Sequence, residues 1–202
     1  LRQGEIPPLS KDVRALFFGG ISLACEPCAE AYAGVLAHEG RGRVSMLDLN
    51  VRPRFIEDDA AYRDRLAGMI EHTTLLKTSD EDLDWLMPGG GSMADKAGIL
   101  LERGPSLVLV TRGAEGATAY RKNRPTITVP AQSGPVADTV GAGDTFNAGV
   151  LAWLDQNQRL TQAALAALSD DDLEAALTYG AKAAAVTVSR RGANPPWRNE
   201  IG

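Results

Sequence analysis

The sequence is poor in the residues that build redox and metal sites. Its 202 residues include two cysteines and two histidines. Cys25 and Cys28 form a single Cys-x-x-Cys pair, which would suit a redox pair or half of a zinc site. There is no second cysteine pair, and His38 and His72 stand alone in the sequence. We therefore favour two ordinary thiols at the start of a helix, in a reducing, cytoplasmic compartment.

The sequence also lacks long apolar runs and a strong charge of either sign. The longest runs, such as Leu107–Val110, are too short to span a bilayer, and the polar start at residues 1–5 is not a signal peptide. The net charge of −5 argues against nucleic acid or an anionic membrane as partner. The length and a hydrophobic content of 44% suit one domain over residues 1–202. Because Leu1 rather than Met begins the chain, we expect a fragment or a processed product.

Apolar runs alternate with helix-forming segments along the chain. Strands are expected near residues 15–18, 44–49, 74–76, 106–111, 117–121 and 126–129. Helices are expected near residues 26–39, 58–70, 79–87, 93–103, 142–156, 161–168 and 170–187. This order predicts an α/β fold with a mostly parallel sheet covered by helices on both faces, and the last two strands as a pair at the sheet edge.

Short polar or glycine-containing segments follow the expected parallel strands. They are Gly19-Gly20, Asn50–Pro53, Lys77–Ser79 and Thr111–Gly113. In a parallel sheet the carboxyl ends of the strands meet at one edge, and ligands bind beyond that edge. We therefore expect these segments to line one edge together with residues 141–144.

Residues 138–147 combine a glycine-rich turn with the start of a helix. From Ala142 onward, apolar residues recur at helical spacing, which predicts a helix. Gly141 directly precedes this helix, and Gly143 and Asp144 lie in its first turn. Free N–H groups and the helix dipole make such a place an anion site, and the dipole favours a charged carboxylate. That carboxylate could accept a proton from a hydroxyl while the N–H groups stabilise negative charge. A plain helix start is the alternative interpretation.

The string from Asp138 to Asp144 resembles the second signature of the PfkB (ribokinase-like) carbohydrate kinase family, Asp-Thr-x-Gly-Ala-Gly-Asp. The resemblance implies a ribokinase-like three-layer α/β/α sandwich that uses ATP and Mg²⁺ to phosphorylate a sugar hydroxyl. It also implies that Asp144 is the catalytic base, and that the amides of Gly141, Ala142 and Gly143 form the anion hole.

A second segment, Asp48–Pro53, is similar to the Asp-x-Asn-x-Arg-Pro segment of fructokinases and 2-keto-3-deoxygluconate kinases in this family. The similarity implies that Asn50 and Arg52 contact the substrate or its phosphate. An arginine at a strand end can bind either group through two parallel donors. Without these neighbours Arg52 would be read as a surface residue.

A third segment, Lys77–Asp82, resembles the place where the family carries Asn-x-x-Glu near the phosphates and the metal. Here the match is Ser79-x-x-Asp82, so the pattern differs. The resemblance implies that Lys77 and Ser79 bind ATP and that Asp82 holds Mg²⁺, through water. A helix cap explains Ser79 and Asp82 equally well.

Two further features resemble the family's nucleotide side. Thr111, Gly113 and Gly116 match its Thr-x-Gly-x-x-Gly turn, and Ala181 lies in a segment that looks like its adenine-side wall. A hairpin and a packed alanine-rich helix are the alternatives. Some relatives bind a monovalent cation near the position of Asp138, so K⁺ is a further candidate ligand.

The resemblance covers the later two-thirds of the family fold and includes neither the lid nor the first sugar-binding signature. A fructokinase is the enzyme it indicates. A 2-keto-3-deoxygluconate kinase and a catalytically inactive nucleotide-binding remnant are the alternatives. Without the lid, this chain is expected to bind ATP weakly and to phosphorylate little or no sugar. Without the first strands of the family fold, a sheet edge or an apolar patch is expected to be uncovered, which favours self-association, for example as a homodimer.

Overall fold

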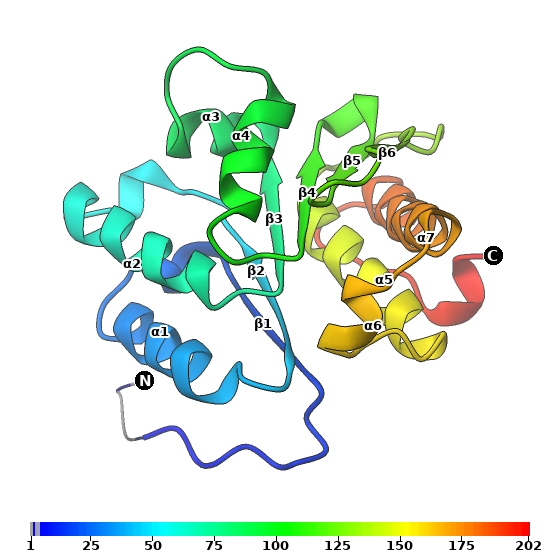
Figure 1. Ribbon diagram of the computed structural model, residues 1–202. Helices are drawn as coiled ribbons and strands as arrows, with labels where there is room; N and C mark the ends of the chain where they lie inside the picture. Colours follow the sequence, from blue (N-terminus) through cyan, green and yellow to red (C-terminus); the bar gives the residue numbers. More distant parts are fainter. Residues whose placement is uncertain (1, 3–4) are drawn as a thin grey trace.

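The chain folds around one six-stranded sheet in the order β1-β2-β3-β4-β5-β6 (Figure 1). The computed structural model describes residue 2 and residues 5–202. The first four strands are parallel and the last two are antiparallel. The strands are β1 (Ala15–Gly19), β2 (Val44–Asp48), β3 (Leu75–Ser79), β4 (Leu107–Thr111), β5 (Ala117–Tyr120) and β6 (Ile127–Val129).

Helices cover both faces of the sheet, as the alternation of segments predicts (Figure 1). One apolar core joins the sheet to α1 (Cys28–Glu39), α2 (Asp59–Glu71), α3 (Asp80–Leu86) and α4 (Met93–Leu101). The other core joins the sheet to α5 (Ala142–Gln156), α6 (Gln162–Ala166) and α7 (Asp170–Val188). Short 3₁₀ turns lie at Gly20–Leu23, Pro53–Phe55, Gly113–Glu115 and Arg198–Glu200. The three-layer sandwich is therefore confirmed.

Helix α5 places the glycine loop on the sheet because its apolar residues recur at helical spacing. Phe146, Val150 and Leu154 are buried against the sheet core. On its other side α5 packs along α7, where Gly149 and Gly180 allow close backbone contact. A Cβ on Gly149 would lie 2.8 Å from Cα of Gly180. Contacts with the sheet on one side and with α7 on the other thus fix the position of α5 and of the loop that precedes it.

The register of the parallel strands brings the predicted site segments to one edge. Gly19 lies opposite Asp48, Asp48 opposite Lys77, and Ser79 opposite Thr111. The expectation that Lys77–Ser79 follow a strand was wrong. Pairing with β4 extends β3 through Ser79, so Lys77 lies in the middle of the strand.

Smaller differences concern helix ends. The first helix begins at Cys28, after Pro27, and the fourth ends at Leu101 rather than near residue 103. The short helix expected near 161–168 covers Gln162–Ala166. Thr161 caps it by accepting the N–H of Ala164 at 3.1 Å.

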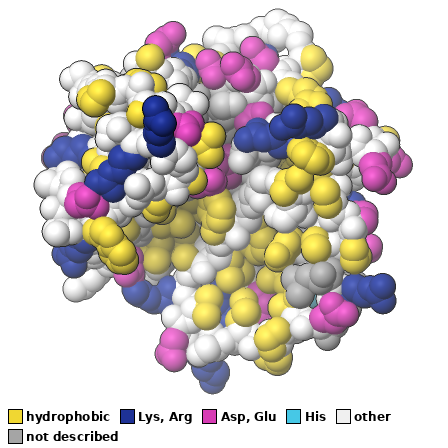
Figure 2. Space-filling view, turned by 180° about the vertical axis from the view of Figure 1, so that it is seen from behind, with side chains coloured by type: hydrophobic (Ala, Val, Ile, Leu, Met, Phe, Trp, Pro, Cys, Tyr) yellow, Lys and Arg dark blue, Asp and Glu magenta, His cyan; other side chains and the backbone are white. Residues whose placement is uncertain are grey.

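Strand β1 forms an open edge of the sheet and carries exposed apolar side chains. Phe17 is 47% exposed, and Ile21, just after the strand, is 46% exposed. Figure 2, seen from behind, shows hydrophobic side chains gathered in a hollow at the middle of that face. The expected uncovered edge is confirmed, and self-association stays a prediction. Among the described residues no helix is long and apolar enough to cross a membrane.

Candidate active site

The glycine loop enters α5 through a left-handed residue. Gly141 has a φ of +80° and is the residue before the helix, and a Cβ there would lie 3.1 Å from Cβ of Ala193. Both facts favour glycine. The Ala142 N–H donates to the carbonyl of Thr139 at 3.2 Å. The N–H groups of Gly143 and Asp144 have no backbone acceptor in the part of the chain that the structure describes. The N–H group of Gly141 likewise has no acceptor there, so the open donors are those of Gly141, Gly143 and Asp144. The amide of Ala142, predicted for the anion hole, is engaged.

Asp144 lies in the first turn of α5, and its side chain is exposed. Within residues 5–202 its carboxylate makes no hydrogen bond or ion pair. The helix dipole favours negative charge at this position. An exposed, unpaired carboxylate beside open N–H donors can accept a proton from a bound hydroxyl.

Asp138 holds the loop from its other side. Its two carboxylate oxygens accept the N–H groups of Val140 at 3.0 Å and of Gly192 at 2.8 Å. These backbone donors, the Val140 N–H first, lower the pKa of Asp138 below its usual value. Asp138 therefore ties the glycine loop to the segment after α7.

Two threonines extend this connection beneath the loop. Thr145 donates its hydroxyl to the carbonyl of Gly141 at 2.8 Å, and Thr187 of α7 donates to the Thr145 hydroxyl at 3.0 Å. Both threonines are buried. The carbonyl of Gly141 is thus hydrogen-bonded by a side chain, while the N–H groups of Gly141, Gly143 and Asp144 remain open to a ligand.

A buried polar cluster lies beneath the start of α5. Lys77 donates to both carboxylate oxygens of Asp48, at 3.1 and 3.3 Å. Asn147 of α5 donates its Nδ2 to the same carboxylate at 2.7 Å. The exposed fractions of Asp48, Lys77 and Asn147 are 1%, 5% and 1%. Lys77, expected to bind ATP, is therefore enclosed rather than presented to solvent.

The carboxylate of Asp82 connects two segments by a hydrogen bond. It accepts the N–H of Val51 at 3.1 Å, which ties the Asn50–Arg52 turn to α3. Burial and then the nearby Asp82 carboxylate raise the pKa of Tyr62 to about 12, while Arg52 acts in the opposite direction. Ser79 caps α3 by accepting the Asp82 N–H at 3.0 Å. The cap interpretation of Ser79 is confirmed, and its predicted ATP contact stays a prediction.

Asn50 and Arg52 follow β2 at the edge that receives the loop. Asn50 has a left-handed φ of +35°, which asparagine tolerates better than most residues. Arg52 is exposed and donates one N–H to the carbonyl of Val51 at 3.0 Å. Most of its donors are therefore available to a phosphate or carboxylate.

The residues predicted on the nucleotide side are less uniform. Thr111 ends β4, and Gly113 has a φ of +50° in the turn that follows. Gly116 is structural, because a Cβ there would lie 2.1 Å from the carbonyl oxygen of Val129. Ala181 is 8% exposed and packs within α7, so it offers little surface to a ligand. Contacts of these residues with ATP stay predictions.

Comparison with known proteins agrees with this geometry. Residues 8–200 match the family described as pfkB family carbohydrate kinase. The chain belongs to this family. It is 44% identical over 169 residues to a fructokinase of Rhizobium leguminosarum bv. trifolii, which covers 84% of this chain and 51% of that protein. The chain thus spans about half the length of that relative.

Solved structures of two fructokinases share the fold. A fructokinase of Xylella fastidiosa with bound ATP has a TM-score of 0.83 and 26% identity, over 93% of this chain and 60% of that one. A fructokinase of Vibrio cholerae, with fructose, ADP and potassium ion bound, has a TM-score of 0.81 and 23% identity. That match covers 96% of this chain and 59% of the other. At this identity the second likeness shows the fold alone.

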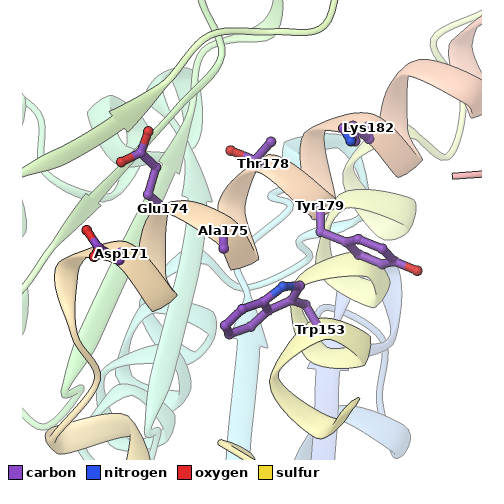
Figure 3. A pocket seen from close by; sticks show the side chains of 7 residues that line it. All are labelled: Trp153, Asp171, Glu174, Ala175, Thr178, Tyr179 and Lys182. Atoms are coloured by element: carbon purple, nitrogen blue, oxygen red, sulfur yellow. The ribbon is translucent and has the colours of Figure 1, made fainter. Parts of the chain in front are cut away.

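Two cavities of the described chain lie away from the glycine loop. One, of about 500 Å³, is lined by Trp153 of α5 and by residues of α7 (Figure 3). In that view Asp171, Glu174 and Tyr179 point outward rather than toward a common centre. Another, of about 340 Å³, lies before the amino ends of β2, β3 and β4. Neither contains a residue predicted for the site.

The described residues hold no group of three or more His, Cys, Asp or Glu side chains arranged for a metal ion. Magnesium usually keeps several waters and is bound by one or two carboxylates together with substrate phosphates, so the donors present here fit an ion that arrives with a nucleotide.

Two residues of the site, Asp48 and Asn147, have no role predicted from the sequence. A usable signal is present, because Asp48 and Lys77 are charged residues in otherwise buried strands of sequence VSMLD and LLKTS. A charge inside a strand that is buried on both faces requires a partner. Asn147 carries no comparable signal.

Proposed function

We propose that the protein containing this chain transfers the γ-phosphoryl group of ATP to a hydroxyl of fructose. One observation carries the proposal. The unpaired carboxylate of Asp144 lies next to the open N–H groups at the amino end of α5, at the carboxyl edge of the parallel sheet. A base and an anion site adjoin there, as transfer of a phosphoryl group to a hydroxyl requires.

Each residue has a defined task in this proposal. Asp144 takes the proton of the attacking hydroxyl, and the open N–H groups of Gly141, Gly143 and Asp144 stabilise charge on the transferred group. Arg52 and Asn50, at the end of β2, contact the sugar or its phosphate. Mg²⁺, when bound with ATP, would neutralise phosphate charge, and Asp82 would hold it through water.

The preference for fructose is supported by the fructokinase of Rhizobium leguminosarum and by the Asn50-x-Arg52-Pro53 segment. A 2-keto-3-deoxygluconate kinase is the second enzymatic candidate, because the same segment occurs in such kinases. A remnant that binds nucleotide without catalysis is the third candidate, because the chain spans about half the length of that relative.

Potassium is proposed as an activating ion on two grounds. The Vibrio cholerae fructokinase structure contains it, and the Asp138 carboxylate lies beside the loop, where the sequence resemblance predicts a monovalent cation. Both Asp138 oxygens already accept backbone N–H groups, so backbone carbonyls would complete such a site. Replacing K⁺ by Na⁺ at constant ionic strength in the kinase assay tests this.

The function is tested by ATP consumption against a sugar panel. The chain, and any longer natural polypeptide that contains it, are assayed with D-fructose, 2-keto-3-deoxygluconate and no sugar. Sugar-dependent ADP formation that is fastest with fructose supports the proposal. Faster turnover of 2-keto-3-deoxygluconate favours the second candidate, and ATP binding without any phosphorylation favours the remnant.

A further inference from the structure

The buried cluster of Asp48, Lys77 and Asn147 has a use beyond holding the sheet together. Asp48 ends β2 and lies directly opposite Lys77 on β3, so both side chains project to one face of the sheet. Asn147 reaches the same carboxylate from α5, which covers that face. The three residues thus connect two strands with the second turn of the helix that opens at the glycine loop.

The ammonium of Lys77 also lies close to Gly143 of the loop. A Cβ built on Gly143 would lie 3.3 Å from Nζ of Lys77, with no other such neighbour within 4 Å. A lysine ammonium has three N–H donors, and its contacts with Asp48 are two longer hydrogen bonds to one carboxylate. The positive charge of Lys77 therefore lies directly beneath Gly143, whose N–H group is open.

Stability alone does not explain this arrangement. A buried ion pair is often no more stabilising than apolar residues of the same size. A cation at a helix amino terminus is placed against the helix dipole, which favours a carboxylate there. In addition, Oδ1 of Asn147 is buried without a hydrogen-bond partner in the described part of the chain. Departures from local rules of this kind are concentrated at functional sites.

We propose that Lys77 is a positioning residue of the anion site. It is held by Asp48, whose carboxylate Asn147 fixes in turn, and it sets the place of Gly143 and adds positive charge beneath a bound phosphate. The inference deepens the proposed function and rests on it for the identity of the anion as a nucleotide phosphate. It replaces the expectation of direct ATP contact, because Lys77 is 5% exposed and its ammonium is paired with Asp48.

The decisive variant removes both charges of the pair. Lys77→Met alone would leave the Asp48 carboxylate buried without a partner, so the test uses Lys77→Met with Asp48→Asn. The matched control is Lys96→Met with Asp84→Asn, because Lys96 is also 5% exposed and pairs with Asp84 at 2.6 Å, but lies on α4. All proteins are titrated with ATP, ADP and adenosine by calorimetry, and thermal unfolding is measured in parallel.

The double variant is expected to unfold near the wild-type temperature while its ATP dissociation constant rises about tenfold or more. The loss should be smaller for ADP and absent for adenosine, since it depends on phosphate charge. The control pair should leave all three titrations unchanged. Wild-type ATP affinity in a folded double variant overturns the inference, and so does an equal loss for adenosine.

Asp48→Asn alone provides an independent measurement if the double variant does not fold. It keeps the ammonium and an amide oxygen that can still accept from it, so Lys77 stays in place. ATP affinity should equal or exceed that of the wild type although the unfolding temperature falls. A loss of ATP affinity in this variant would show a merely structural role and overturn the inference.

Failure of the proposed function gives a different pattern. Wild-type chain that binds ATP but phosphorylates no sugar contradicts the kinase assignment, while the ATP titrations of the variants still decide the role of Lys77. Wild-type chain that is folded and binds neither ATP nor ADP contradicts the anion site itself and overturns the inference with it.

Discussion

The two sides of the candidate site differ in whether their polar groups are buried and hydrogen-bonded. Beneath the loop, Asp48, Lys77 and Asn147 are enclosed and bonded to one another. Above it, Asp144 is exposed and unpaired, and the N–H groups beside it are open. Buried charges must be paired to be tolerated, whereas a group that reacts must remain accessible. The enclosed groups therefore support the loop, and the accessible groups are free to meet a ligand.

The largest expected effect comes from the open side. Asp144→Asn keeps the shape of the side chain but removes the proton acceptor, so kcat should fall by about 10²–10⁴-fold with ATP affinity little changed. Steady-state kinetics in a polypeptide with measurable turnover checks this. Asp155→Asn, near the other end of α5 and paired with Arg14 on the surface, is the control and should retain turnover. Near-wild-type kcat in Asp144→Asn rejects Asp144 as the base.

The next effect arises where the two sides meet. Gly143→Val places a β-branched side chain where phosphate must approach and where Lys77 lies, so ATP affinity should fall by at least about tenfold. Calorimetric titration measures it, with helix content followed by circular dichroism. Gly98→Val is the matched control, because Gly98 is also helical and a Cβ there has nothing within 4 Å. An unchanged ATP titration for Gly143→Val would count against the loop as the phosphate site.

A smaller effect is expected for the hydrogen bond by which Asp82 of α3 holds the turn after β2. Asp82→Ala leaves the Val51 N–H without its acceptor, which should lower the free energy of unfolding by about 1–3 kcal/mol. Urea unfolding in the presence of a chelator measures this without metal. Glu81→Ala, exposed in the same turn of α3, is the control. Unchanged stability together with a lost response to Mg²⁺ would instead make Asp82 a metal-site residue.

The smallest effect concerns pH and the exposed side of the loop. Backbone N–H groups lower the pKa of Asp138 in the folded protein, so its contribution to stability is present above the ordinary carboxyl pKa of about 3.9 and is lost as pH falls through the lower folded value. Asp138→Asn should therefore lose less stability than the wild type between about pH 5 and pH 2. Thermal unfolding across this range checks the sign.

Asp95→Asn controls for this pH effect, because hydrogen bonds with Ser92 lower the pKa of Asp95 at a site on α4. It should reduce the acid-side loss in the same way but leave ATP binding unchanged. An Asp138→Asn variant with the wild-type pH profile would show that the two backbone bonds do not distinguish the folded from the unfolded carboxylate.

Local pattern in the sequence by itself determined the order of strands and helices, the start of α5 at Ala142, and the adjoining glycines and carboxylate of the candidate site. These features depend on near neighbours, through periodicity, capping and turn chemistry. Only the tertiary structure decided which polar groups are enclosed. Asn147 and Asp48 are 99 residues apart, Lys77 and Asp48 are 29 apart, and Val51 and Asp82 are 31 apart. Strand register and helix packing set those contacts, because a buried charge finds its partner in space rather than along the chain.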